Sequence, residues 1–320
     1  MIGATAPILH RLRVDPAGEH AALLAGLRAP NASISPKYFY DAAGCELFAA
    51  ICALPEYYPT RTERGIFEAH RVEIAHVIGS GTQLVDLGAG DGRKAAQWFA
   101  ALRPSRYIAV DIAAQEITQA LASLSDAHPD IGMTGIVADF TQALDLESDL
   151  DSRAATFFYP GSSIGNFPHP AARAFIAGIA RHCATRPGSG LLIGVDMQKD
   201  VQRLVAAYDD AQGVTAAFNR NVLLHANRIA PANFDAAAFV HRASWDPVEG
   251  RVQMHLEAQR TQNVDIAGAQ RWFRAGERIH TEDSYKYTPA QFSEMLRAAG
   301  FAQVSLWQDA AGDFGVFYAS

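Results

Sequence analysis

Cysteine is scarce in this chain, which has three cysteines among 320 residues. Cys45, Cys52 and Cys183 form no Cys-x-x-Cys pair, and an odd number leaves at least one thiol unpaired. The sequence therefore argues against a disulfide-stapled secreted domain and against a zinc ribbon. We expect a protein of a reducing compartment, the cytoplasm.

Long apolar runs are also missing. No stretch reaches the roughly 18 consecutive apolar residues that a membrane-spanning helix needs. The first residues lack the apolar core, preceded by basic residues, that marks a signal peptide. We therefore expect neither a membrane span nor a secretory leader.

Charge of one sign is nowhere concentrated. The net charge is −7 and no long like-charge run occurs, so the basic surface typical of nucleic-acid-binding proteins is not indicated. The 11 histidines lack the His-x-x-x-His or cysteine spacing of a metal site. We expect no nucleic-acid partner and no metal, and a monomer that binds a small molecule.

What the chain does contain is an alternation of strands and helices between residues 82 and 196. The expected strands are 83–88, 106–111, 132–138, 154–159 and 190–196. The expected helices are 93–102, 113–125 and 170–184. Continuous apolar strands that alternate with helices predict a parallel sheet covered on both faces.

The flanking segments have other patterns. Residues 1–80 look mostly helical, and one helix is expected to begin near Glu63, capped by Thr60 or Thr62. From 237 to 280 apolar and polar residues alternate with period two, which is typical of half-exposed antiparallel strands.

Two domains follow from these patterns. We predict an α/β core formed by residues 60–196 plus 286–320. We predict a second, α+β lobe formed by residues 1–59 plus 197–285.

The most informative stretch is Leu-Val-Asp-Leu-Gly-Ala-Gly-Asp-Gly at residues 84–92. Gly88, Gly90 and Gly92 let the backbone approach a ligand where a buried strand ends. The spacing Asp-x-Gly-x-Gly-x-Gly resembles the first motif of class I methyltransferases, which bind S-adenosylmethionine, more than the dinucleotide fingerprint. The expected fold is a class I S-adenosylmethionine-dependent methyltransferase (Rossmann-like) core with an added substrate lobe.

Acidic residues end the next two strands. Asp111 lies 25 residues after Asp86, where a carboxylate typically accepts hydrogen bonds from ribose hydroxyls. Asp139 ends the third strand and can accept from an adenine amino group. Each aspartate alone could be a turn former or a helix cap, but the set indicates a nucleoside site. Asp86 and Asp91 beside the turn favour a cationic sulfonium over a pyrophosphate.

A set of longer segments extends from about residue 36 to the C-terminus. They are Pro36–Asp41, Leu54–Glu63, Val85–Lys94, Gly161–Phe167, Ala207–Asn221 and Ile279–Thr288. Together they resemble the bacterial L-histidine Nα-methyltransferases of ergothioneine biosynthesis, which convert histidine to its trimethyl betaine, hercynine. The resemblance implies that S-adenosylmethionine is the cofactor and that histidine binds between the core and the added lobe.

The resemblance also implies site residues. The implied cofactor contacts are Gly88, Gly90, Lys94, Asp111 and Asp139. The implied histidine contacts are Tyr57, Asn166, Tyr208, Met254, Glu282, Ser284 and Phe48, with Phe48 facing the growing ammonium and Met254 along the imidazole. Asn166 and Tyr40 are then the catalytic residues. The first presents the amine, and the second relays its proton through water.

The residues themselves support a site for an imidazole. Glu282 and Ser284 are two positions apart, so in an extended segment both side chains face the same way. A carboxylate accepts the imidazole N–H, and a hydroxyl serves the other ring nitrogen. The aromatic clusters suit a methylated ammonium, although core packing is the commoner role for Phe39 and Phe218.

Other hypotheses stay open at this point. A methyltransferase of the same family could act on another amino acid or on a histidine derivative, against which Glu282 and Ser284 argue. A nicotinamide-dependent oxidoreductase and a non-catalytic binding module that keeps the fold are the alternatives from other classes.

Overall fold

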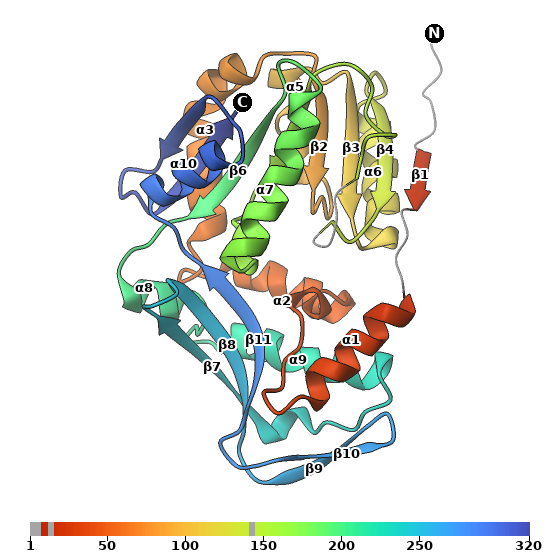
Figure 1. Ribbon diagram of the computed structural model, residues 1–320, viewed down its shortest axis with the longest axis vertical. Coiled ribbons are helices and arrows are strands. Elements are labelled where there is room, and N and C mark those ends of the chain that lie inside the picture. Colours follow the sequence, from red (N-terminus) through yellow and green to blue (C-terminus); the bar gives the residue numbers. More distant parts are fainter. Residues whose placement is uncertain (1–7, 12–15, 141–144) are drawn as a thin grey trace.

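The computed structural model describes residues 8–11, 16–140 and 145–320. A large sheet flanked by helices occupies one end of the molecule, and a second lobe with smaller sheets occupies the other (Figure 1). The chain passes between these two parts more than once, as its colours show.

The large sheet has the strand order β1-β4-β3-β2-β5-β6-β13-β12. Its strands are β1 (Ile8–Arg11), β2 (Gln83–Leu87), β3 (Arg106–Asp111), β4 (Gly132–Val137), β5 (Ala155–Tyr159), β6 (Gly190–Asp196), β12 (Val304–Gln308) and β13 (Phe314–Ala319). The pairs from β1 to β6 are parallel, whereas β13 is antiparallel to both of its neighbours. Counted from β2, the parallel strands have the order 3-2-1-4-5. The order therefore reverses beside β2, where open α/β sheets bind ligands.

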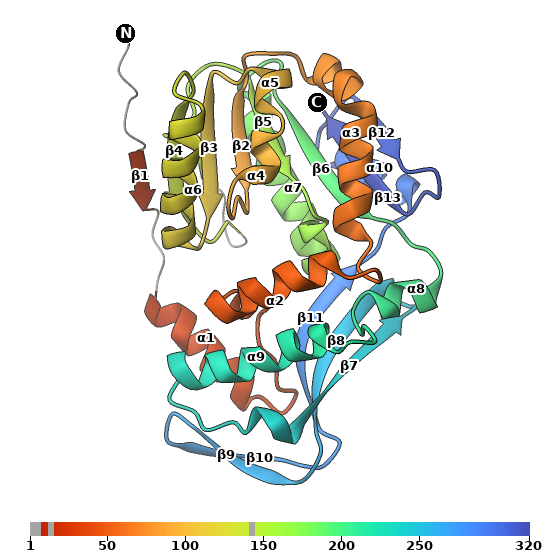
Figure 2. The same cartoon turned by 180° about the vertical axis from the view of Figure 1, so that it is seen from behind.

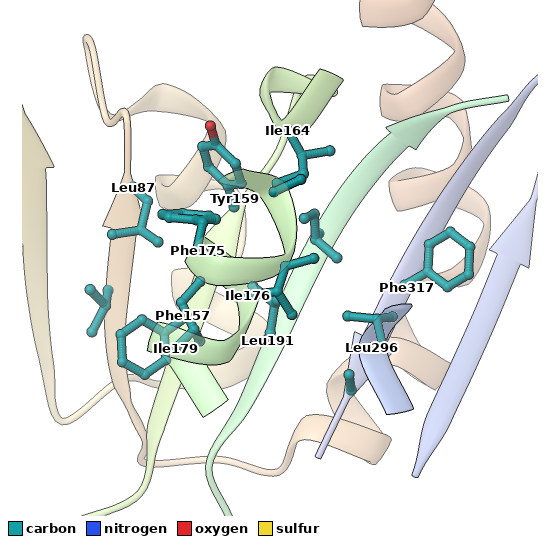
Figure 3. Close-up of a cluster of buried hydrophobic side chains, with 14 of the residues drawn as sticks. Leu87, Phe157, Tyr159, Ile164, Phe175, Ile176, Ile179, Leu191, Leu296 and Phe317 are labelled. Carbon is teal, nitrogen blue, oxygen red and sulfur yellow. The ribbon is translucent and has the colours of Figure 1, made fainter. Parts of the chain in front are cut away.

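Helices cover both faces of this sheet because its central strands are apolar on both sides. β2, β5 and β6 are buried at every position. One face packs against α7 (His169–Ala184) and α10 (Pro289–Ala298), with Phe157, Ile176 and Leu296 in the cluster (Figure 3). The helices on the other face are α3 (Pro59–Ile78), α4 (Arg93–Ala96), α5 (Phe99–Leu102) and α6 (Ala114–Ala127) (Figure 2). The expected doubly covered parallel sheet is confirmed.

The second lobe has its own apolar core. Its helices are α1 (Pro16–Arg28), α2 (Ala42–Ala53), α8 (Val201–Ala206) and α9 (Val214–Ile229), with the 3-10 helices η1 (Pro36–Phe39) and η3 (Ala236–Ala238). Its strands are β7 (Phe239–Asp246), β8 (Arg251–Ala258), β9 (Gln262–Ile266), β10 (Ala269–Phe273) and β11 (Arg278–Tyr285). These strands form the antiparallel sheet β11-β8-β7 and the hairpin β10-β9. In β8 inward residues alternate with outward ones, as the period-two pattern predicted.

Local details differ from the sequence expectations. α3 begins at Pro59 rather than near Glu63, because proline fixes a helical φ at the first position of a helix. The expected helix 93–102 is divided into α4 and α5 by a tight turn that buries Trp98. The mostly helical N-terminal region also contains β1, which pairs with β4 at the edge of the sheet.

The separate apolar cores support the predicted division into two domains, which stays a proposal. Side chains from 23–58 and from 204–279 share one cluster, whereas the clusters on the large sheet draw on the predicted core segments apart from Met197 and Tyr285, which lie at the predicted boundaries. Among the described residues, no helix has both the length and the apolar character needed to cross a membrane.

Candidate active site

A pocket lies between the carboxyl edge of the large sheet and the second lobe. Its wall contains every residue that the sequence predicted for histidine binding or catalysis. These are Tyr40, Phe48, Tyr57, Asn166, Tyr208, Met254, Glu282 and Ser284. The structure thus brings the whole predicted set together, while the role of each residue stays a prediction.

Glu282 faces this pocket because β11 contains an irregularity. Strict alternation from the buried Ile279 would turn Thr281 inward and Glu282 outward. Instead the pairing with β8 shifts register at this point, and Glu282 pairs with Met254. The hydroxyl of the extra residue, Thr281, donates to the Met254 carbonyl at 3.0 Å. This bulge reverses the phase of the strand, so Glu282 and Ser284 share the pocket face.

The carboxylate of Glu282 has no hydrogen bond or ion pair with any residue in the described part of the chain. Burial raises its pKa to about 7, although the Lys286 ammonium acts in the opposite direction. A carboxylate that is partly buried and unpartnered is costly, and a ligand N–H that binds to it lowers that cost.

Aromatic rings form one side of the pocket. Tyr40 and Phe48 meet edge to face with ring centroids 5.6 Å apart, and Phe48 and Tyr57 do so at 6.1 Å. Phe218 stacks on Phe39 at 4.6 Å, and both rings are almost fully buried in the core of the lobe. Core packing is therefore right for Phe39, whereas Phe218 both packs in the core and lines the pocket. Such ring faces attract a methylated ammonium.

The candidate catalytic groups are neutral. Burial raises the pKa of the Tyr40 phenol, and the nearby Glu282 carboxylate adds to this effect. Tyr40 is therefore a neutral hydroxyl and not a phenolate, so its predicted role as a proton relay requires a hydroxyl that both accepts and donates. Asn166 ends the 3-10 helix η2 (Ser163–Asn166) after β5, and its side chain has no hydrogen-bond partner among the described residues. Both its amide oxygen and its NH₂ group remain for a ligand.

Sequence reasoning missed a buried cation at the base of the pocket. Lys286 is 2% exposed, and its ammonium lies 2.8 Å from Asp196. It also donates to the Tyr208 hydroxyl at 2.9 Å and to the Ser284 hydroxyl at 2.8 Å. The two hydroxyls lie 2.7 Å apart, so one of them donates to the other. One hydroxyl hydrogen of this group is then left for a ligand.

Asp196 is the anion that stabilises the buried ammonium of Lys286. It ends β6, is fully buried and accepts a hydrogen bond from the Tyr58 hydroxyl at 2.8 Å. Lys199 contacts the same carboxylate, and burial lowers the pKa of Lys199 to about 8. The neighbouring cations hold the pKa of Asp196 low in spite of its burial. The position of Lys286, two residues after Ser284, indicated that its side chain could reach the same site. Nothing in the sequence indicated that its partner would be Asp196 at the end of β6.

The glycine turn follows β2 as the sequence predicted. Gly88, Gly90 and Gly92 have φ values of 74°, 52° and 68°, which side chains disfavour. Asp111, at the end of β3, accepts hydrogen bonds from the backbone N–H groups of Gly90 at 2.9 Å and Ala113 at 3.0 Å. Asp111 therefore shapes the turn, and a carboxylate has further lone pairs for a ligand.

The other cofactor candidates lie around the same edge. Asp139 follows β4 and contacts Lys37 at 3.2 Å. Lys94, on α4, contacts Glu63 at 2.9 Å. The glycine turn, Asp111, Asp139 and Lys94 thus surround the carboxyl ends of β2, β3 and β4.

Asp86 does not line the turn as we expected. It is 2% exposed and accepts a hydrogen bond from the Tyr107 hydroxyl at 2.8 Å. Burial raises its pKa to about 7. Because Asp86 lies inside the strand, beneath the turn, it cannot present a carboxylate to a sulfonium. Asp91 is exposed and pairs with Arg93.

The sequence of this chain matches a known enzyme family. The family described as "Histidine-specific methyltransferase, SAM-dependent" matches residues 19–320. The chain belongs to this family. Histidine N-alpha-methyltransferases of Mycolicibacterium smegmatis and Mycobacterium tuberculosis are 42% and 39% identical to it, over 91% and 92% of both chains. Ergothioneine biosynthesis protein 1 of Neurospora crassa is 31% identical over 84% of this chain and 31% of its own length.

The protein is therefore an S-adenosylmethionine-dependent N-methyltransferase, and the predicted resemblance and class I fold are confirmed. A crystal structure of a Pyrococcus horikoshii OT3 protein shares the fold alone. It is 10% identical, with a TM-score of 0.50 over 88% of this chain and 99% of that one. Family membership excludes the oxidoreductase. The chain's own residues fit the cofactor, because the glycine turn leaves room for it and carboxylates follow the adjacent strands.

Proposed function

We propose that the protein methylates the α-amino nitrogen of L-histidine, up to the trimethylated betaine hercynine. One observation carries this proposal. The unpartnered Glu282 carboxylate lies beside Ser284 in an aromatic pocket that opens at the same sheet edge as the glycine turn. The family description and the mycobacterial relatives support histidine as the substrate.

The donor binds across the ends of the parallel strands. When bound, S-adenosylmethionine supplies a methyl group on a cationic sulfur, open to in-line attack by an amine. Gly88 and Gly90 allow close approach of the backbone, and Asp111 and Asp139 accept hydrogen bonds from the nucleoside. Lys94 contributes a positive charge at the start of α4.

The pocket orients histidine for this attack. Glu282 accepts the imidazole N–H. One hydroxyl hydrogen remains free among the side chains that contact Lys286, and it donates to a substrate atom that carries a lone pair and no hydrogen. The Asn166 amide holds the amino group with its lone pair toward the methyl group. A neutral amine is already a good nucleophile, so most of the rate comes from this positioning.

Repeated methylation requires space and a route for protons. Each transfer forms an N–C bond and breaks the S–C bond, and the amine must lose a proton before the next transfer. Tyr40 relays this proton through water. Phe48 and Tyr57 present rings to the growing ammonium, which makes no strong hydrogen bonds once methylated. Met254 lies along the imidazole.

Mass spectrometry of histidine incubated with the enzyme and S-adenosylmethionine tests this function. The expected products differ by steps of about 14 mass units per added CH₂, end after the third methyl group and carry every methyl group on the α-nitrogen. Ring methylation, or faster turnover of a non-imidazole amino acid in a parallel panel, would contradict the proposal. The second result would favour the family member with another substrate.

We further propose that the protein acts in the cytoplasm as a monomer. The three cysteines have no disulfide partners, which suits a reducing compartment. Light scattering behind size-exclusion chromatography should give the mass of one chain, and twice that mass would contradict the monomer.

A further inference from the structure

A buried carboxylate joins two walls of the donor site. Glu63, on α3, is 1% exposed. One of its oxygens accepts the backbone N–H of Gly161 at 2.6 Å, and the other lies 2.9 Å from the Lys94 ammonium. Gly161 follows β5, and Lys94 lies on α4 after the glycine turn. Glu63 therefore connects the loop after β5 to the helix after β2.

The sheet makes room for this carboxylate. Gly194, in β6, packs so closely that a Cβ atom at this position would lie 2.0 Å from Oε1 of Glu63. Burial of a carboxylate is costly unless it is paired and hydrogen-bonded, and Lys94 and Gly161 supply those two partners. Lys94 remains partly accessible, with 44% of its side chain exposed, so its ammonium has N–H groups left for a ligand.

The order of the strands indicates which end of the donor lies beside the Lys94 ammonium. Asp139 follows β4, Asp111 ends β3 and the glycine turn follows β2, in spatial sequence along the edge of the sheet. A donor whose nucleoside lies at Asp111 and Asp139 extends its amino-acid end past the turn, toward β5. Lys94 lies at that end, since a Cβ atom on Gly161 would be 3.2 Å from its Nζ.

We propose that Glu63 is a positioning residue, which holds Lys94 and the loop at Gly161 in place so that Lys94 binds the amino-acid end of S-adenosylmethionine. This inference rests on the donor site of the proposed function. Lys94 supplies a cation for the donor carboxylate, and Glu63 fixes both the direction of that cation and the loop after β5. Glu63 itself does not touch the reacting atoms.

Calorimetric binding to the whole protein, without histidine or turnover, tests this role. S-adenosylhomocysteine carries the amino-acid end, whereas 5′-methylthioadenosine keeps the nucleoside and lacks that end. Glu63→Gln should weaken binding of S-adenosylhomocysteine by about 10-fold or more and that of 5′-methylthioadenosine by less than about 2-fold. Glu68→Gln, an exposed position on the same helix, is the matched control and should change neither affinity.

A second variant keeps the test decisive if Glu63→Gln does not fold. Gly194→Ala leaves Glu63 present but displaces its carboxylate, so it should show the same selective loss. Equal weakening of both ligands in the folded variant, or no weakening of either, would overturn the role of Glu63. If the wild-type protein bound neither ligand, the donor site of the proposed function would fail as well.

Discussion

The donor side and the histidine pocket are built in different ways. Most of the donor-side candidates, including Gly88, Asp111 and Asp139, lie at or directly after the ends of β2, β3 and β4, next to strands that the sequence reveals. The pocket is assembled from segments between Tyr40 and Lys286 that meet only in the folded chain. Local sequence is enough to specify the first region, whereas the second depends on tertiary packing.

The two regions also differ in how they handle charge. On the donor side, Asp111 accepts backbone N–H groups and is partly exposed, and the buried Glu63 pairs with a half-exposed Lys94. In the pocket, Lys286 and Asp196 are buried ions that depend on each other. Because water no longer screens such charges, substitution of Lys286 should have a larger effect than substitution of the partly exposed Asp111.

The largest effect is expected from Lys286→Met, which leaves Asp196 buried with fewer partners. Breaking a buried ion pair costs about 3–5 kcal/mol, and the lower end applies because Lys199 still contacts Asp196. Chemical denaturation should show this loss. Arg242→Met removes one side of an exposed ion pair with Glu257 and should cost less than about 1 kcal/mol. Equal losses in the two variants would remove the contrast between buried and exposed charge.

Glu282→Gln should come next. It removes the anionic acceptor for the ring N–H, so the KM for histidine should rise by about 100-fold, a loss of about 2.7 kcal/mol. The KM for S-adenosylmethionine should change by less than about 3-fold. Initial rates measured while each substrate is varied give both constants. A similar rise in both would refute the role of Glu282 in specificity.

The same residue should also make stability depend on pH. The pKa of Glu282 is raised from 4.5 to about 7 in the folded protein, so the folded state binds more protons than the unfolded state in this window. The free energy of unfolding therefore falls as pH rises from about 4.5 to about 7. Glu282→Gln should remove on the order of 2 kcal/mol of this decline. Identical pH profiles for the two proteins would contradict the shift.

The smallest effect in this series is expected from Asp111. Asp111→Asn keeps the shape of the side chain but loses its charge, and should weaken S-adenosylhomocysteine binding about 10-fold. Asp91→Asn, an exposed acid in the same turn, is the control and should leave the affinity unchanged. Calorimetry that finds equal losses in both variants would show that net charge near the turn matters more than the position of Asp111.

Much of the fold was predictable because its signals are local. The apolar runs that became β2, β3 and β6 are strands in the structure, and the turn with Gly88 and Gly90 follows β2 as expected. The start of α3 was wrong because Pro59 sets the first helical position. The pocket residues were found through the family resemblance, and no periodicity in the chain would have grouped Tyr57 with Tyr208.

The missed features share one physical cause. The bulge at Thr281, the ion pair of Lys286 with Asp196 and the burial of Asp86 all depend on which segments pack together. A single-chain pattern gives the types of these residues but not their partners. The partners of the buried charged residues are therefore the part of this site that only the structure reveals.

A crystal structure with L-histidine and S-adenosylhomocysteine bound together tests the central claim most directly. The account predicts an imidazole nitrogen about 2.6–3.2 Å from the Glu282 carboxylate, with the α-amino group turned toward the sulfur. It predicts the nucleoside beside Asp111 and the amino-acid end of the donor beside Lys94. An imidazole bound away from Glu282, or a donor that does not cross the turn at Gly88, would contradict it.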